Sequence, residues 1–188
     1  MNLAGADIII VVLDPTIVEG SAVIGGLGLA QYSRIEYAQK VQKLFSVLEK
    51  SNPNKQFFYA VCITKADLIP GSRYLHPDAL IEAFFGPEML DVVDTIGSER
   101  AQTFTTSSFG YLPGTDKPNA QMNEYERIEI KDVKNWKPYG VEYPFFWAFE
   151  SKERKLLEEI LRKSFWGKMM RKNVLRNYVS YPKAKYEN

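Results

Sequence analysis

This 188-residue sequence contains only one cysteine and one histidine, and this scarcity limits the kinds of site it can form. Cys62 cannot form an intrachain disulfide, and its place in an apolar run predicts a small buried side chain in a reducing compartment. From one cysteine and one histidine we expect no metal-ligand cluster, Ser-His-Asp set or Cys-His pair. His76 stands beside Pro77, where a solvated or hydrogen-bonded place in a loop is expected rather than catalysis.

Long hydrophobic runs and an excess of one charge are also lacking. The apolar run at residues 6–13 is too short for a bilayer, which needs about 20 apolar residues. No basic stretch precedes an apolar core at the amino terminus, so we expect no secretory signal and a cytoplasmic location. Lysines and arginines number 24 and aspartates and glutamates 23, so the net charge of +1 predicts no bulk attraction to nucleic acid or acidic membrane.

The sequence does have the composition of a packed domain, with 45% hydrophobic and 13% aromatic residues. Its length fits one domain, or one domain with an appendage. We therefore expect a single α/β domain over residues 1–188, with a surface insertion at about 111–142 and a basic carboxyl-terminal helix or tail at about 144–188.

Three apolar runs predict strands at residues 7–14, 57–64 and 101–106. The first two are rich in β-branched or aromatic residues without polar alternation, which is typical of strands buried on both faces of a parallel sheet. A shorter alternating piece at residues 127–133 predicts a strand or hairpin within the insertion.

Helical spacing of apolar residues separates these strands. Ser33 and Glu36 form a capping-box pattern before a helix that extends to about Lys50. Residues 78–92 are expected to be helical, with Gly86-Pro87 dividing them in two, and a last helix begins at Pro144. Alternating strands and helices predict a partial parallel sheet of three strands, with helices on both faces.

Residues 64–67 read Thr-Lys-Ala-Asp and directly follow the second predicted strand. Lys65 and Asp67 should therefore lie at the carboxyl edge of the sheet, which is the edge where open α/β sheets bind ligands. The third strand ends nearby in sequence order with Ser107 and Ser108. The competing interpretation is an ordinary polar turn after each strand, because short motifs often occur by chance.

Together these features resemble the carboxyl-terminal half of a P-loop GTPase domain of the TRAFAC type, from its fourth strand to its last helix. Residues 139–147 are also similar to the start of the last helix in bacterial double-GTPase proteins. The resemblance implies a three-layer P-loop fold in which Asp67 accepts two hydrogen bonds from guanine and the stem of Lys65 covers the base. Thr64 stands where the family usually has an Asn that ties neighbouring loops, and Ser107 and Ser108 would offer a backbone N–H to the guanine oxygen.

The phosphate-binding part of that family is lacking. No Gly-x-x-x-x-Gly-Lys-Ser/Thr sequence occurs, and the glycines at residues 25–28 are not followed by a lysine. The order of the parts places the family's first half before Met1. We therefore expect weak binding of GTP or GDP, magnesium only with the missing half, and no hydrolysis by this chain alone.

The resemblance and the charge pattern also suggest what this chain could bind. The apolar strand at residues 8–13 would be a bare edge, which we expect to be covered by the missing half, a second copy or the insertion. The basic residues at 152–176 suit an acidic membrane, a nucleic acid or a partner protein, but an ordinary last helix with a solvated basic face is favoured. The alternative function is a degenerate, nucleotide-free GTPase-like module for protein interaction, and a small α/β enzyme of other chemistry is a third.

Overall fold

The computed structural model describes residues 7–19, 31–69, 71–125 and 127–163. The chain divides into two compact units, residues 1–141 and 142–188, and each is described by itself. The glycines at residues 25–28 and the basic residues after 163 lie outside the described residues.

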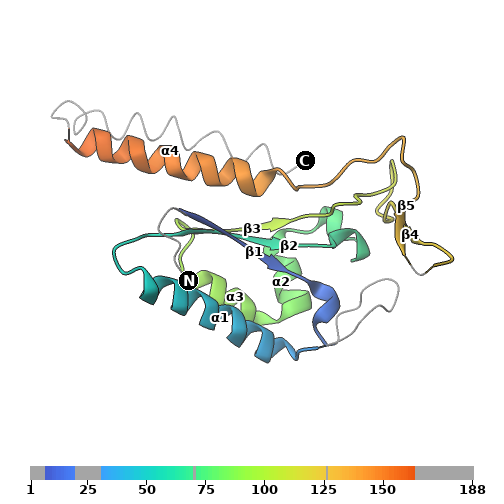
Figure 1. The fold of residues 1–188 in the computed structure, drawn as a ribbon, viewed down its shortest axis with the longest axis horizontal. Helices are drawn as coiled ribbons and strands as arrows, with labels where there is room; N and C mark the ends of the chain where they lie inside the picture. Colours follow the sequence, from blue (N-terminus) through green and yellow to red (C-terminus); the bar gives the residue numbers. More distant parts are fainter. Residues whose placement is uncertain (1–6, 20–30, 70, 126, 164–188) are drawn as a thin grey trace. The chain divides into compact units, whose positions relative to one another are not determined.

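The first unit is built on a three-stranded parallel sheet (Figure 1). Its strands are β1 (Ile8–Leu13), β2 (Phe58–Ile63) and β3 (Ala101–Thr105), in the order β1-β2-β3. All six residues of β2 are buried, as its apolar sequence without alternation predicts for a central strand. The predicted α/β class and parallel sheet are confirmed.

Three helices cover one face of this sheet (Figure 1): α1 (Arg34–Ser51), α2 (Pro77–Phe85) and α3 (Pro87–Asp94). The predicted capping box is present, because the Ser33 side chain accepts from the Glu36 N–H and Glu36 accepts from the Ser33 N–H. Gly86 has a φ of +89°, which glycine tolerates, and it separates α2 from α3 as expected.

A single apolar core joins the helices to the sheet. The odd-numbered residues of β1 and β2 face the helices, since strand side chains alternate between faces. Leu13, Tyr59, Val61 and Ile63 are 0% exposed in this core. Cys62 points to the other face and is also buried, which raises the pKa of its thiol to about 12. The prediction of a small buried side chain at Cys62 is confirmed.

The predicted insertion contains an antiparallel pair of strands, β4 (Ala120–Met122) and β5 (Ile128–Ile130). Its base is fixed by Asn119, which is 0% exposed. The Asn119 amide donates to the Asp132 carbonyl at 3.1 Å, and the Asp132 N–H donates back to Asn119 at 2.8 Å. The expected short hairpin in this segment is confirmed.

The second unit contains α4 (Tyr143–Lys163), which begins one residue before the predicted Pro144. Within the described ranges, no helix has the combination of length and hydropathy that crossing a bilayer requires. Four of the nine lysines and arginines at 152–176 lie beyond residue 163, and contact of this segment with a membrane or a nucleic acid stays a prediction.

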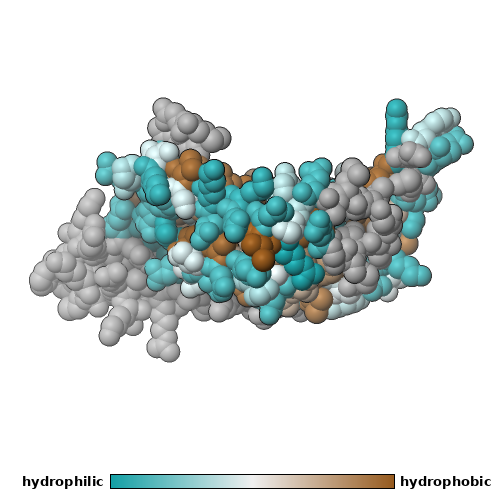
Figure 2. All heavy atoms as spheres, turned by 90° about the horizontal axis from the view of Figure 1, so that it is seen from below, coloured by the Kyte–Doolittle hydropathy of each residue, from teal (hydrophilic) through white to brown (hydrophobic). Residues whose placement is uncertain are grey.

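Apolar side chains also reach the surface. On α1, Ile35, Leu44 and Val47 are exposed, and on β1 Ile10 and Val12 are 39% and 57% exposed. The surface in Figure 2 is mostly hydrophilic, with separate apolar patches rather than one continuous area. Single exposed apolar residues of this kind are usual on folded proteins.

Candidate functional site

The predicted site residues come together at the carboxyl edge of the sheet. Backbone hydrogen bonds from Thr64 N to Leu13 O (2.9 Å) and from Thr106 N to Ile63 O (2.8 Å) bring the ends of the three strands into one row. The Thr64 hydroxyl adds a bond to the Leu13 carbonyl at 3.1 Å. Thr64 therefore ties the ends of β1 and β2 together.

Asp67 lies in a short 3-10 helix (Ala66–Leu68) and is only 1% exposed. Its Oδ1 accepts a hydrogen bond from the Ser107 hydroxyl, and the hydroxyl in turn accepts from the Gly110 N–H at 2.8 Å. The other oxygen, Oδ2, is buried and has no partner among the described residues. Asp67 and Ser107 are thus in direct contact, although they are 40 residues apart in sequence.

Burial controls the electrostatics of this carboxyl group. Desolvation raises the pKa of Asp67 above its usual value, and the hydrogen bond from Ser107 offsets this only in part. A buried acceptor without a donor costs about 1–3 kcal/mol. The Oδ2 atom is therefore a position where a donor from a ligand would gain more than it would on the surface.

Two residues that the sequence did not single out extend this polar cluster. The Ser72 hydroxyl donates to the Ala66 carbonyl at 2.5 Å and lies 2.8 Å from the Tyr111 hydroxyl. Tyr111 is buried, and desolvation raises its pKa to about 12. No local motif marks Ser72 or Tyr111, because only the fold brings them to the loop that carries Asp67.

The loop after β3 is held from the insertion side. Ser107 and Tyr139 exchange backbone hydrogen bonds at 2.9 and 2.8 Å, so the Ser107 N–H is already used. The Ser108 N–H has no hydrogen-bond partner among the described residues, and the Ser108 carbonyl accepts from the Trp136 indole at 2.9 Å. Of the two predicted backbone donors, the structure therefore leaves Ser108 available and Ser107 engaged.

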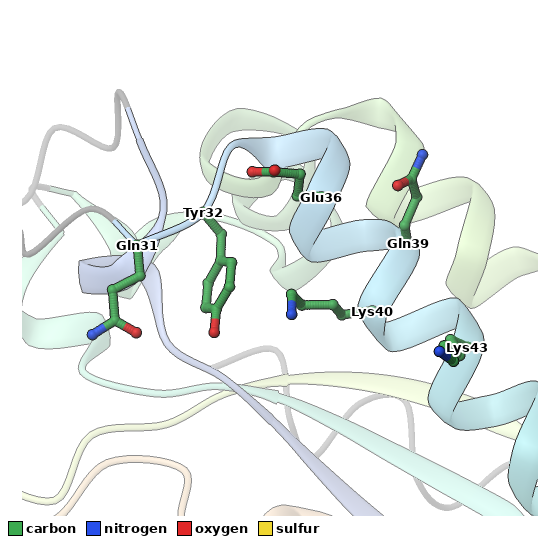
Figure 3. Close-up of a pocket in the computed structure, with 6 residues that line it drawn as sticks. All are labelled: Gln31, Tyr32, Glu36, Gln39, Lys40 and Lys43. Atoms are coloured by element: carbon green, nitrogen blue, oxygen red, sulfur yellow. The ribbon is translucent and has the colours of Figure 1, made fainter.

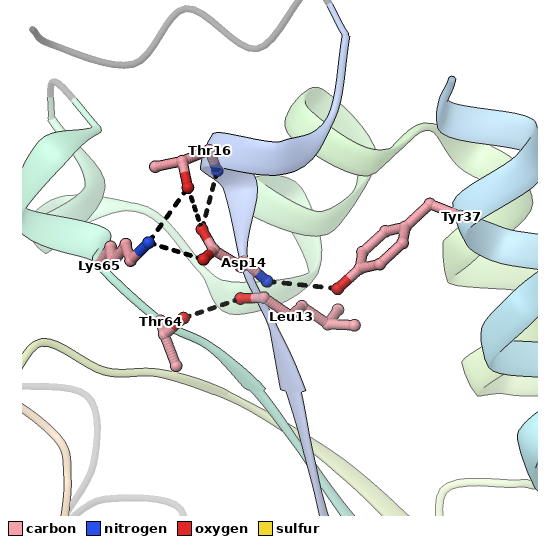
Figure 4. Close-up of polar contacts among 6 residues, drawn as sticks. All are labelled: Leu13, Asp14, Thr16, Tyr37, Thr64 and Lys65. Carbon is pink, nitrogen blue, oxygen red and sulfur yellow. Dashed lines mark hydrogen bonds and ion pairs between the residues drawn. The ribbon is translucent and has the colours of Figure 1, made fainter. Parts of the chain in front are cut away.

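Lys65 lies on the other side of β2 and contacts the end of β1 (Figure 4). Its ammonium group is 2.6 Å from Asp14 Oδ2 and 3.1 Å from the Thr16 hydroxyl. Asp14 also caps the 3-10 helix Pro15–Ile17, because its side chain accepts from the Thr16 N–H. Desolvation raises the pKa of Asp14, but hydrogen bonds from Lys65 and Thr16 outweigh it and the pKa is lowered overall.

A separate pocket of about 390 Å³ lies beside α1, and none of these residues lines it (Figure 3). It is lined by Gln31, Tyr32, Glu36, Gln39, Lys40 and Lys43. The Lys40 ammonium stands 4.7 Å from the centre of the Tyr32 ring, so the pocket's aromatic face is already in contact with a cation. Among the described residues no group of three or more His, Cys, Asp or Glu side chains could hold a metal ion.

No protein-family profile, curated protein or solved structure matches this chain. The guanine-binding roles of Thr64, Lys65, Asp67, Ser107 and Ser108 therefore stay predictions. His76, predicted to be solvated or hydrogen-bonded, is exposed and accepts from the Asp78 N–H at 3.3 Å as the cap of α2.

Proposed function

We propose that the carboxyl edge of this sheet binds the base of a guanine nucleotide. The supporting observation is the direct contact between Asp67 after β2 and Ser107 after β3, with the Ser108 N–H unpaired beside them among the described residues. A carboxylate and a backbone donor on adjacent loops match guanine, which presents two N–H donors and a carbonyl acceptor on one side.

The chemistry of Asp67 favours guanine over adenine. The Oδ2 atom lacks a donor within the described structure, and Oδ1 keeps a second lone pair after accepting from Ser107. Two hydrogen bonds from the guanine ring and exocyclic nitrogens would pair both oxygens. Adenine has no such pair of donors, and leaving the carboxylate unpaired would cost about 1–3 kcal/mol, or roughly tenfold or more in affinity.

Binding requires a local opening of the site. Asp67 and Ser107 are each 1% exposed, so a base reaches the carboxylate only after the loop after β3 shifts. The free energy of that opening reduces the observed affinity, because only the open fraction binds ligand. We expect a dissociation constant on the order of 1 mM for base contacts alone.

Phosphate and magnesium ligands would have to come from a segment that pairs with β1. The bonds from Phe58 N to Asp7 O and from Thr64 N to Leu13 O turn the odd-numbered carbonyls of β1 toward β2. The N–H and C=O groups of Ile8, Ile10 and Val12 therefore point away from β2, and no described strand pairs with them. We propose that a strand of a phosphate-binding segment, or failing that a second copy, covers this edge.

Ligand-observed NMR with GDP, and with ADP as the control, tests the proposed site. We expect saturable binding of GDP and binding of ADP weaker by about tenfold or more. Asp67→Asn should abolish the preference, because the amide replaces an acceptor by a donor. Asp91→Asn, on the exposed surface of α3, is the matched control and should bind like the wild type. Equal binding of GDP and ADP by the wild type would contradict the proposed function.

One observation favours the second candidate, a nucleotide-free GTPase-like module for protein interaction. Asp67 is closed by Ser107 and the Lys65 ammonium is engaged by Asp14, so both polar groups of the motif are satisfied internally apart from Oδ2. In this case neither nucleotide would bind, even when a phosphate-binding segment is supplied on a separate chain.

A further inference from the structure

Lys65 has an unusual backbone conformation for its residue type. Of the described residues other than glycine, it alone has a positive φ, with φ 53° and ψ 32°. The left-handed region is unfavourable for residues other than glycine, and such residues concentrate at binding sites and active sites. This conformation starts the 3-10 helix that carries Asp67, and it directs the Lys65 side chain toward β1 (Figure 4).

Asp14 and Thr16, which accept hydrogen bonds from the Lys65 ammonium, also bond to each other and are less exposed than the lysine itself. Asp14 Oδ1 accepts from both the N–H (2.9 Å) and the hydroxyl (2.6 Å) of Thr16, which leaves Oδ2 for Lys65. Thr16 is only 8% exposed, and the Asp14 N–H donates to the Tyr37 hydroxyl at 3.4 Å. The Lys65 side chain is 48% exposed, against 25% for Asp14.

An ion pair this exposed contributes little to stability. Its effect is geometric: it fixes both ends of a four-carbon stem, at the end of β2 and at the end of β1. The stem therefore extends across the carboxyl edge on the β1 side, whereas the Ser107 contact of Asp67 lies on the β3 side.

From this arrangement we infer that Asp14 and Thr16 are positioning residues, which hold the stem of Lys65 as an apolar wall for a planar purine base. The inference rests on the proposed guanine site. Since Asp14 neutralises the ammonium group, we expect Lys65 to contact the base through its stem and not to pair with a phosphate group. Guanosine, GMP and GDP should therefore bind the chain with affinities that agree within about twofold.

The test combines a chemical readout with a binding readout. Asp14→Asn removes the negative charge that pairs with the Lys65 ammonium, and Thr16→Val removes the hydroxyl that accepts from it with little change in shape. Agreement between the two variants would show that the effect does not come from one substitution alone. Acylation of Lys65 by a small amine-reactive ester is followed by peptide mass spectrometry, with the exposed Lys50 as the internal reference. We expect Lys65 to react roughly two- to fivefold faster in both variants, and not in Asp91→Asn.

Guanosine titration by ligand-observed NMR completes the experiment. Faster acylation together with weaker guanosine binding in both variants supports the inference. Unchanged acylation overturns it, whatever the nucleotide does. A third outcome is faster acylation in both variants but no guanosine binding by any of the proteins, including the wild type. That outcome overturns both the inferred role of the Lys65 stem and the proposed function. Asp14 would then only link the loops after β1 and β2.

Discussion

Replacing Asp67 by Asn should stabilise the folded protein at neutral pH. The substitution keeps an oxygen that can accept from the Ser107 hydroxyl, and it removes a charge from a side chain that is 1% exposed. Relief of the buried, unpaired Oδ2 is worth about 1–3 kcal/mol, and the new amide needs an acceptor of its own. We therefore expect a net gain of about 1 kcal/mol in the free energy of unfolding at pH 7.5.

The gain in stability from Asp67→Asn should increase with pH, because Asp67 is buried. Because burial raises the pKa of Asp67 in the folded protein, the folded state binds this proton more tightly than the unfolded state does. The contribution of Asp67 is therefore fully favourable below its unfolded pKa of about 3.9 and is lost as pH rises through the folded value. The difference between Asp67→Asn and the wild type should be largest at pH 7.5 and shrink toward zero near pH 4.

Urea unfolding followed by circular dichroism measures this difference at each pH. The lowered pKa of Asp14 acts in the opposite direction, since its contribution is lost as pH falls, but it is common to both proteins and cancels in the comparison. The control Asp91→Asn should stay within about 0.5 kcal/mol of the wild type at every pH. If Asp67→Asn is less stable than the wild type at pH 7.5, the carboxylate is a net stabiliser and the reasoning fails.

Three further substitutions and one matched control test the fold by the same urea assay. Gly110 has φ +71°, and an added Cβ would lie 2.0 Å from the Lys137 carbonyl oxygen, so Gly110→Ala should lower the free energy of unfolding by more than about 2 kcal/mol. The control Gly114→Ala has a similar φ of +69° but open space around the added Cβ, so it should cost about 1 kcal/mol. Equal losses would argue against the close contact at Gly110. Ser33→Ala breaks the capping box of α1 and should cost about 0.5–2 kcal/mol, and no loss would mean that the cap is redundant. Ile63→Ala, at a 0% exposed position of the central strand, should cost about 2–5 kcal/mol, and a loss below 1 kcal/mol would indicate a core that collapses around the cavity.

The elements of the first unit could be read from local patterns. β-branched runs identified β1 and β2, and Ser33 with Glu36 marked the start of α1 by the chemistry of unpaired N–H groups. The break at Gly86-Pro87 followed from the conformational limits of those two residue types. These features depend on neighbours in sequence, so no knowledge of the tertiary fold was needed.

The closure of the site could not be predicted in the same way. The sequence places Asp67 and Ser107 at one sheet edge but does not indicate that the Ser107 hydroxyl covers the carboxylate. Ser72 and Tyr111 join the cluster across 39 residues, and an ordinary Ser or Tyr in a loop gives no sign of it. For Lys65 a signal was available: Asp14 ends the strand next to the one that Lys65 follows, and adjacent parallel strands bring their carboxyl ends together.

The hydrogen bond from the Trp136 indole to the Ser108 carbonyl supplies an optical reporter for this edge of the sheet. Trp136 is 50% exposed, so its emission should respond when the loop after β3 changes its hydrogen bonding or hydration. The chain has three tryptophans, and replacing Trp147 and Trp166 by Phe would leave Trp136 as the single fluorophore. A stopped-flow instrument could then follow the opening of the loop in real time without any attached dye.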